Sequence, residues 1–303
     1  MTIPTRLEDL PIVPLRHPWR WVGIAVIAVA IVTFAHSLIT NQRYEWDVVF
    51  GYFLSPVILS GLAMTIMLTI VSMVIGLAIG IVLAAMRVSR SQVFRSTSGA
   101  YIWFFRGTPI LVQLVFWYNL GYLYPEFQIG LPFSEPWFAT NINDIITPLT
   151  AALLGLSLNE GAYLAEIVRA GILAVPPGQS EAASSLGMTK FQAFRRIVLP
   201  QAMRVIIPPT GNETIGMLKM TSMVSVIALA DLMYAAQTIY SRTFETIPLL
   251  ICVSIWYLIL TSLLSIGQGY IERYFGRGEA NATASERNLL PRAPRKPEPG
   301  ATE

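Results

Sequence analysis

Few residues of this sequence could carry chemistry, and the most unusual of them lies inside a long apolar stretch. Glu160 stands near the middle of the run 147–168, with Asn159 and Tyr163 beside it. An ionised carboxylate at the centre of a bilayer costs at least about 2.5 kcal/mol unless it faces protein or water. Glu160 is therefore expected to face inward, either on a path where it meets an amino or guanidino group or as a buried partner between helices.

A second set of polar residues lies in the following apolar run, 210–236. Its residues Asn212, Glu213 and Lys219 could supply the partner that a buried carboxylate requires. The candidates for lining a polar path are Glu160, Asn159, Tyr163, Asn212 and Lys219. Asp231 lies toward the outer end of the same run, where exposure to water would be enough to explain it.

Several kinds of site are not expected here. The potential ligands His17, His36 and Cys252 form no cluster with zinc or haem spacing, so no metal is predicted. The phosphate-binding pattern GxxxxGK[ST] is absent, and so is a recognisable pairing of nucleophile and base. The chain is therefore not expected to be an enzyme or to bind ATP itself.

Long apolar segments must position these residues. The chain has 303 residues, of which 54% are hydrophobic and 13% charged, whereas a soluble domain is usually about a quarter charged. Apolar runs of 18 or more residues can cross a bilayer of roughly 30 Å, and irregular backbone cannot face lipid. The sequence therefore predicts an all-α polytopic membrane protein. Six crossing segments are marked at 21–39, 56–86, 100–124, 147–168, 210–236 and 248–270.

Basic residues alternate between the connecting segments. Three Lys/Arg precede the first span, four lie in 87–106, five in 169–208 and six after residue 270, against one, none and one in the intervening loops. By the positive-inside rule both termini and the two basic loops are cytoplasmic, as an even number of spans also requires. Glu166 and Arg169, three residues apart near the cytoplasmic end of their segment, are expected to pair with each other.

The most informative stretch is the basic loop before the fifth span. Residues 181–183 are expected to open a short helix that Gly187 ends, because glycine accepts left-handed backbone at little cost. Thr189 is a candidate N-cap for a second short amphipathic helix, which Pro200 closes. Such a helix pair could fit a groove on a partner protein, or it could lie on lipid headgroups.

The same loop resembles the EAA motif of ABC importer permeases. The matching residues are Glu181, Ala182, Ala183, Gly187, Leu199 and Pro200. The resemblance implies that 178–200 forms coupling helices that dock onto separate ATPase subunits. Those subunits would bind ATP and Mg, and this chain would carry no cofactor.

Further motifs are similar to the polar amino acid uptake branch of that family, the histidine, glutamine and arginine permease type. They are Arg106-Gly107-Thr108-Pro109 with Gln113, Ala162-Tyr163 with 165–167 and Arg169, Gly178-Gln179, and 199–202. Two positions depart from the pattern. The branch often has Lys-Asp-Thr-Ser where this chain has 219–222, and often a second glycine where Ala170 stands.

The resemblance implies how the chain and its complex are organised. It divides the sequence into a cytoplasmic segment 1–20, an added span and outer loop 21–53, a five-helix type I domain 54–272, and a cytoplasmic tail 273–303 without regular structure. The implied partners in the bacterial inner membrane are ATP-binding subunits, a second permease chain, identical or related, and an extracytoplasmic amino acid binding protein, with no nucleic acid. The alternative is an ion-gradient-driven amino acid carrier, for which internal inverted repeats would be expected.

Overall fold

The computed structural model of the chain describes residues 18–131 and 136–289. Its internal contacts divide the chain into two units, Met1–Val48 and Val49–Glu303, and each is described by itself. Most of the predicted cytoplasmic segment 1–20 and the end of the predicted tail, 290–303, lie outside the described residues.

The first unit is built on α1 (Pro18–Thr40), a helix of 23 residues. A 3-10 turn, η2 (Gln42–Tyr44), follows it. Trp46, the first residue of α2 (Trp46–Phe53), donates its indole N–H to the carbonyl of Leu38 at 2.8 Å. The apolar window of α1 is entirely exposed, which suits a helix surrounded by lipid, so the first predicted span is a helix as expected.

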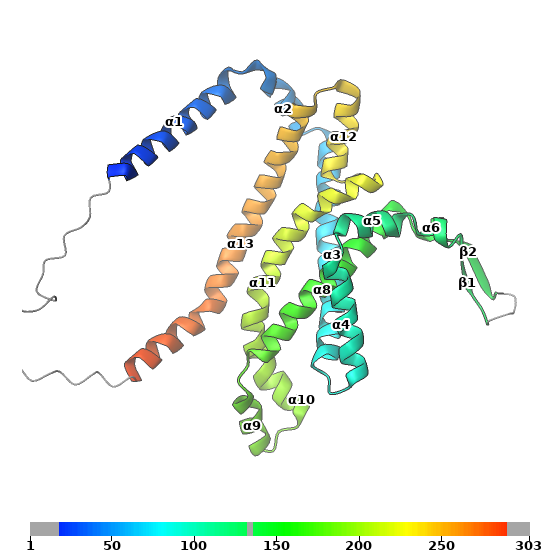
Figure 1. Cartoon of the computed structure of the whole chain (residues 1–303), viewed down its shortest axis with the longest axis vertical. Coiled ribbons are helices and arrows are strands. Elements are labelled where there is room, and N and C mark those ends of the chain that lie inside the picture. Colours follow the sequence, from blue (N-terminus) through cyan, green and yellow to red (C-terminus); the bar gives the residue numbers. More distant parts are fainter. Residues whose placement is uncertain (1–17, 132–135, 290–303) are drawn as a thin grey trace, which may run out of the picture. The chain divides into compact units, whose positions relative to one another are not determined.

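Two long helices organise the second unit, α3 (Pro56–Val88) and α8 (Pro148–Leu173), which lie against each other (Figure 1). A hydroxyl side chain caps the N-terminus of each helix, and a proline occupies its first turn. Small residues of α3 face α8, and a Cβ added at Gly80 would lie 2.8 Å from the Cβ of Leu164. Glycine therefore lets the two backbones approach closely.

The third predicted segment, 100–124, is not one straight span. α4 (Gln92–Gly107) and α5 (Ile110–Tyr118) meet at a bend of 100°, and α6 (Leu120–Leu123) follows. Pro109 between them is extended, and proline has no amide hydrogen with which to continue the helical ladder. The segment marked at 100–124 is therefore a bent pair of helices with its break at Pro109.

The fifth predicted segment, 210–236, is also broken, and its helix begins earlier than expected. α11 (Leu199–Met220) holds the pair Pro208-Pro209 in its interior. η4 (Thr221–Ile227) continues α11 as a 3-10 helix, and α12 (Leu232–Thr243) follows after a bend of 45°. The crossing element therefore starts in the basic loop rather than beyond it.

One part of the described chain is a hairpin of strands. β1 (Glu126–Ile129) and β2 (Phe138–Asn141) pair antiparallel, with Glu126 opposite Asn141 and Ile129 opposite Phe138. The short helix α7 (Ile142–Ile145) follows directly. The all-α prediction holds for the crossing elements, and the hairpin is an addition to it in the loop before the fourth span.

The last helix, α13 (Thr246–Leu289), runs further than the sixth predicted segment. Its backbone is helical over 273–289, so the prediction of a tail without regular structure is wrong for these residues. Within the described ranges, three helices are long and apolar enough to cross a membrane, and the two bent pairs raise this number to five. α8, with 26 residues, lies at the fourth predicted segment, which agrees with about six spans.

The core of the second unit lies where α3, α5, α8 and α11 meet. Leu68, Leu114, Leu156 and Met217 come from these four helices, and each is at most 1% exposed. Because α5 shares this core, the bend between α4 and α5 is held against α8.

Candidate functional site

α9 (Pro177–Ser185) follows α8 directly and lies with α10 (Lys190–Ala193) at one end of the second unit (Figure 1). Pro177 occupies its first turn, so this helix opens four residues before the predicted start at Glu181. Glu181 and Ala182 are exposed, whereas Ala183 is 1% exposed. The exposed pair is accessible to another protein, and the buried alanine holds the helix against its neighbours.

Gly187 ends α9, as predicted. Its φ of 76° lies in the left-handed region, where a residue with a Cβ is strained. The amide of Gly187 donates to Ser184 O at 3.0 Å, and the amide of Met188 donates to Ala183 O at 3.1 Å. A Cβ at Gly187 would meet no atom within 4 Å. Glycine is therefore favoured here by the left-handed backbone and not by a lack of space for a side chain.

α10 (Lys190–Ala193) is continuous with α11 rather than closed by a proline. Thr189 caps it as predicted, since its hydroxyl accepts from the amide of Gln192 while Gln192 Oε1 accepts from the amide of Thr189 at 2.9 Å. The chain then passes through a π-helical turn, Phe194–Val198, into α11. Pro200 lies in the first turn of α11, so the prediction that it closes a second short helix is wrong.

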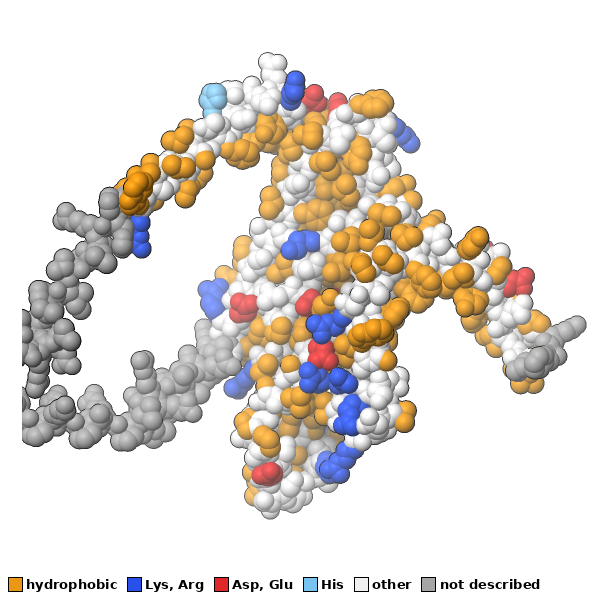
Figure 2. Space-filling view, in the orientation of Figure 1, with side chains coloured by type: hydrophobic (Ala, Val, Ile, Leu, Met, Phe, Trp, Pro, Cys, Tyr) orange, Lys and Arg blue, Asp and Glu red, His pale blue; other side chains and the backbone are white. Residues whose placement is uncertain are grey.

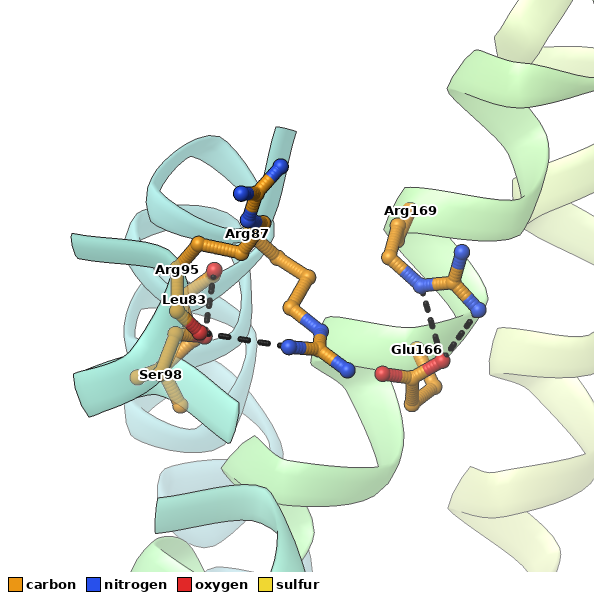
Figure 3. A network of polar contacts seen from close by, with 6 residues as sticks. All are labelled: Leu83, Arg87, Arg95, Ser98, Glu166 and Arg169. Carbon is orange, nitrogen blue, oxygen red and sulfur yellow. Dashed lines mark hydrogen bonds and ion pairs between the residues drawn. The ribbon is translucent and has the colours of Figure 1, made fainter. Parts of the chain in front are cut away.

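The end of α8 nearest this loop carries the predicted ion pair. Arg169 Nη2 lies 2.6 Å from Glu166 Oε2, and Arg169 Nε donates to the same oxygen at 2.9 Å (Figure 3). On the α3–α4 corner, Arg87 Nη1 donates to Arg95 O at 3.2 Å, and its guanidinium extends toward α8 (Figure 3). Lys and Arg side chains gather over this part of the molecule in Figure 2, where the positive-inside rule predicts the cytoplasmic boundary.

Glu160 belongs to a polar cluster within the crossing helices. Its side chain is 2% exposed, and its Oε1 has no hydrogen-bond partner among the described residues. Glu213 of α11 is close enough for its charge to act on Glu160, and the charge of Arg106 of α4 acts on Glu213. The Arg106 guanidinium carbon also lies 5.0 Å from the ring centroid of Tyr163. Glu160, Glu213 and Arg106 are thus charged neighbours in this part of the molecule, and Arg106 lies against the Tyr163 ring.

Arg106 is the member of this cluster that sequence reasoning missed. Counting basic residues places it at the end of a cytoplasmic loop, but α4, with 16 residues, carries it about 21 Å from the start of that helix. The available signal was the run Arg106-Gly107-Thr108-Pro109. A proline that interrupts an apolar segment predicts a broken helix, and the break brings polar groups into the membrane.

Asn159 supports the broken end of α4. Gln113 Nε2 of α5 donates to Phe105 O and Thr108 O, both at 3.1 Å, and to Thr108 Oγ1 at 2.7 Å. Asn159 Nδ2 donates to Phe105 O at 2.8 Å and lies 3.4 Å from Gln113 Oε1. The carbonyls at a helix end require such donors inside a membrane. The two amides therefore hold the corner that carries Arg106.

Asn212 and Lys219 lie on α11 and are exposed, in contrast to the buried Glu160. They are seven residues apart, which is about two helical turns, so they share one face of the helix. A lysine on a crossing helix must face protein or water rather than hydrocarbon. The structure does not bring these two residues into the buried cluster, and their face is open to another chain or to an aqueous path.

Asp231 is 0% exposed, so the prediction that exposure to water accounts for it is wrong. Its Oδ1 accepts from the amide of Tyr234 at 2.9 Å, and its Oδ2 accepts from the amide of Met233 at 3.2 Å. Asp231 is thus the N-cap of α12 at the break after η4.

Residues 76–277 match the family model described as binding-protein-dependent transport system inner membrane component. The chain is 44% identical over 277 residues to the arginine transport system permease protein ArgU of Corynebacterium glutamicum, a match that covers 91% of this chain and 86% of that protein. It is 31% identical to the glutamine transport system permease protein GlnP of Escherichia coli, over 77% of this chain and 98% of the relative.

Solved structures resemble the chain as well. A crystal structure of an amino acid ABC transporter with histidines matches with a TM-score of 0.62 and 38% identity, over 72% of this chain and 94% of that one. An inward-facing structure of the MetNI methionine ABC transporter matches with a TM-score of 0.53 over 75% and 97% of the two chains. Its identity of 21% supports the similarity of fold alone.

Proposed function

Because the chain belongs to the family of binding-protein-dependent transport system inner membrane components, we propose that α9 and α10 are the elements through which separate ATPase subunits drive it. The chain is a multi-pass, membrane-spanning permease subunit of an ABC importer for amino acids. Such a system includes ATP-binding subunits and an extracytoplasmic binding protein. The ion-gradient-driven carrier considered from the sequence is therefore set aside.

The observation that carries the coupling proposal is the geometry of 178–200. α9 exposes Glu181 and Ala182, Gly187 reverses the chain, and the helix that begins at Lys190 runs without a break to Ile227. Closure of the ATPase subunits against α9 and α10 would displace this continuous helix as one body. ATP and Mg bind to those subunits in this proposal, and this chain itself hydrolyses no ATP.

The cluster around Tyr163 is the proposed recognition point on the translocation path. An amino acid carries an ammonium and a carboxylate, and the cluster offers Glu160 and Glu213 for the first and Arg106 for the second. A carboxylate at this point of the path suits a substrate with a cationic side chain. The 44% identity to an arginine transport system permease protein supports the same substrate class.

The remaining candidates on α11 fit a path shared with a second permease chain. The exposed face with Asn212 and Lys219 can be covered by an identical or related copy, so that the two chains enclose water between them. Both termini lie in the cytoplasm in this arrangement. That orientation follows from the basic residues of 87–106 and 169–208.

Co-purification of the tagged full chain from its native membrane tests the coupling proposal. In Glu181→Arg the acidic side chain of α9 is replaced by a basic one at an exposed position, so the fold should be kept while the ATPase contact is lost. Glu126→Arg is the matched control, since Glu126 is also an exposed acid and lies on the hairpin.

The expected result is that ATPase subunits accompany the wild type and Glu126→Arg but not Glu181→Arg, as identified by mass spectrometry. Retention of the ATPase subunits by Glu181→Arg, with unchanged uptake, would refute the role of α9. A Glu160→Gln variant addresses the substrate separately, because it should lower uptake of a basic amino acid without altering the retained partners. Unchanged uptake would exclude Glu160 from recognition.

A further inference from the structure

The hairpin of β1 and β2 has two chemically different faces. Side chains alternate along a strand, and directly opposed residues point to the same side of the hairpin. The register pairs Ile129 with Phe138 and Phe127 with Thr140, so these four residues share one face. The opposite face consists of Glu126, Gln128, Ala139 and Asn141, on which Gln128 Nε2 donates to Glu126 Oε2 at 2.8 Å.

No side chain in the part of the chain that the structure describes buries the apolar face. Phe127, Ile129 and Phe138 are 44%, 49% and 52% exposed. A two-stranded hairpin without further packing is marginal at best in water. The exposed aromatic face therefore requires an environment other than bulk water.

The position of the hairpin along the chain places it near a membrane boundary. β2 ends at Asn141, six residues before Thr147, the N-cap of the crossing helix α8. Even a fully extended chain of six residues spans only about 20 Å. The amide of Ile142 also donates to Pro125 O at 3.0 Å, which closes the base of the hairpin beside α7. The hairpin is thus tied to the level at which α8 begins.

We propose that the hairpin is an interfacial anchor whose Phe127–Ile129–Phe138 face binds the lipid surface at the outer end of α8. Aromatic side chains prefer the headgroup boundary, and an element with one apolar and one polar face can lie in that plane. Hydrophobic side chains cover the visible face of α5 and α6 up to the hairpin in Figure 2, so the apolar surface is continuous. The polar face with Glu126 and Gln128 is then left toward water.

The absence of charge from the apolar face favours lipid over a protein partner. No Lys or Arg occurs anywhere in 107–168, and the acidic Glu126 lies on the opposite face of the hairpin. A membrane surface requires only apolar and aromatic contact. The anchor would fix the loop between α6 and α7 against the bilayer. It would thereby help to keep α5 at its 100° angle to α4.

Adjacent residues of one strand provide a matched test. Phe138→Cys and Ala139→Cys, in a Cys252→Ala background, place an environment-sensitive fluorophore on the apolar and the polar face respectively. The complete importer is reconstituted in nanodiscs, and nitroxide-labelled phosphatidylcholine and aqueous iodide serve as the two quenchers. Ile129→Cys and Gln128→Cys repeat the comparison on the other strand in case one label disturbs the fold.

Binding to lipid predicts blue-shifted emission and several-fold stronger nitroxide quenching at position 138 than at 139, with the reverse order for iodide. Equal quenching of both positions by iodide would overturn the proposal, since the apolar face would then be in water. Shielding of position 138 from both quenchers without the binding protein would assign the face to a second permease chain. Shielding that appears only when the binding protein is added would assign it to that partner, and both results would overturn lipid binding.

Discussion

The corner between α4 and α5 permits a quantitative test of how the broken helix is stabilised. Phe105 O accepts hydrogen bonds from two side-chain amides, Gln113 Nε2 at 3.1 Å and Asn159 Nδ2 at 2.8 Å. Thr108 O accepts from Gln113 Nε2 but not from Asn159. Loss of either amide leaves Phe105 O with one donor, but loss of both leaves it with none. The two side chains should therefore show coupled effects on the free energy of unfolding.

The near-isosteric variants Gln113→Met and Asn159→Leu remove the amides with little change in volume. Hydrogen bonds between membrane helices average about 0.6 kcal/mol and reach about 1.7 kcal/mol, so each single variant should lose an amount in this range. A buried carbonyl without any donor costs about 1–3 kcal/mol. The double variant should therefore lose about 1 kcal/mol or more beyond the sum of the two single variants.

The assay is reversible unfolding of the purified chain in mixed micelles by increasing sodium dodecyl sulfate, followed by circular dichroism and tryptophan fluorescence. Asn119→Leu is the control, because Asn119 is exposed and its amide donates to Val115 O within its own segment at 2.8 Å. Additivity of the two core variants to within about 0.5 kcal/mol would show that the amides act independently and would refute the shared-acceptor argument.

Three further variants test other local features. Gly80→Leu should destabilise the chain by about 1–3 kcal/mol in the same unfolding assay, because its Cβ would lie 2.8 Å from the Cβ of Leu164, whereas Gly23→Leu on α1 should have little effect. Asp231→Ala removes the cap of α12 and should cost about 0.5–2 kcal/mol, and Asp231→Asn should restore most of it. Gly187→Ala places an alanine in left-handed backbone, which should lower the free energy of unfolding by about 1–2 kcal/mol. In proteoliposomes the same variant should transport less amino acid per ATP hydrolysed while the ATPase subunits stay bound.

The features that the sequence predicted correctly depend on nearby residues. The left-handed turn at Gly187 and the N-cap at Thr189 follow from the conformational preferences of single residues and their immediate neighbours. The Glu166–Arg169 pair follows from a spacing of three on one helix. The apolar segments follow from composition alone, because a helix must be mostly apolar over about 18 or more residues to cross a bilayer.

The features that it missed depend on contacts between distant parts of the chain. Asn159 and Gln113 are 46 residues apart, so their shared support of the α4 end is invisible to local pattern analysis. Pro208-Pro209 shows that a local signal can also mislead. Two prolines usually end a helix, but here they lie inside α11, where a packed crossing helix tolerates them. Packing against α13 is visible at this point, because Gln268 of α13 donates its side-chain amide to Pro208 O at 2.6 Å.

The two sides of the polar cluster, one on α4 and α8 and the other on α11, are connected in different ways to 178–200, which we propose as the coupling loop. Arg106 and Tyr163 belong to the side formed by α4 and α8, which Asn159 and Gln113 fasten together. Glu213 belongs to the helix that begins at Lys190, in the proposed coupling loop. A displacement driven through α9 and α10 would therefore change the separation of Glu213 from Arg106 while the contact of Arg106 with Tyr163 is preserved. The charge balance around a bound amino acid would change with that separation, which gives ATPase closure a direct means of altering substrate affinity.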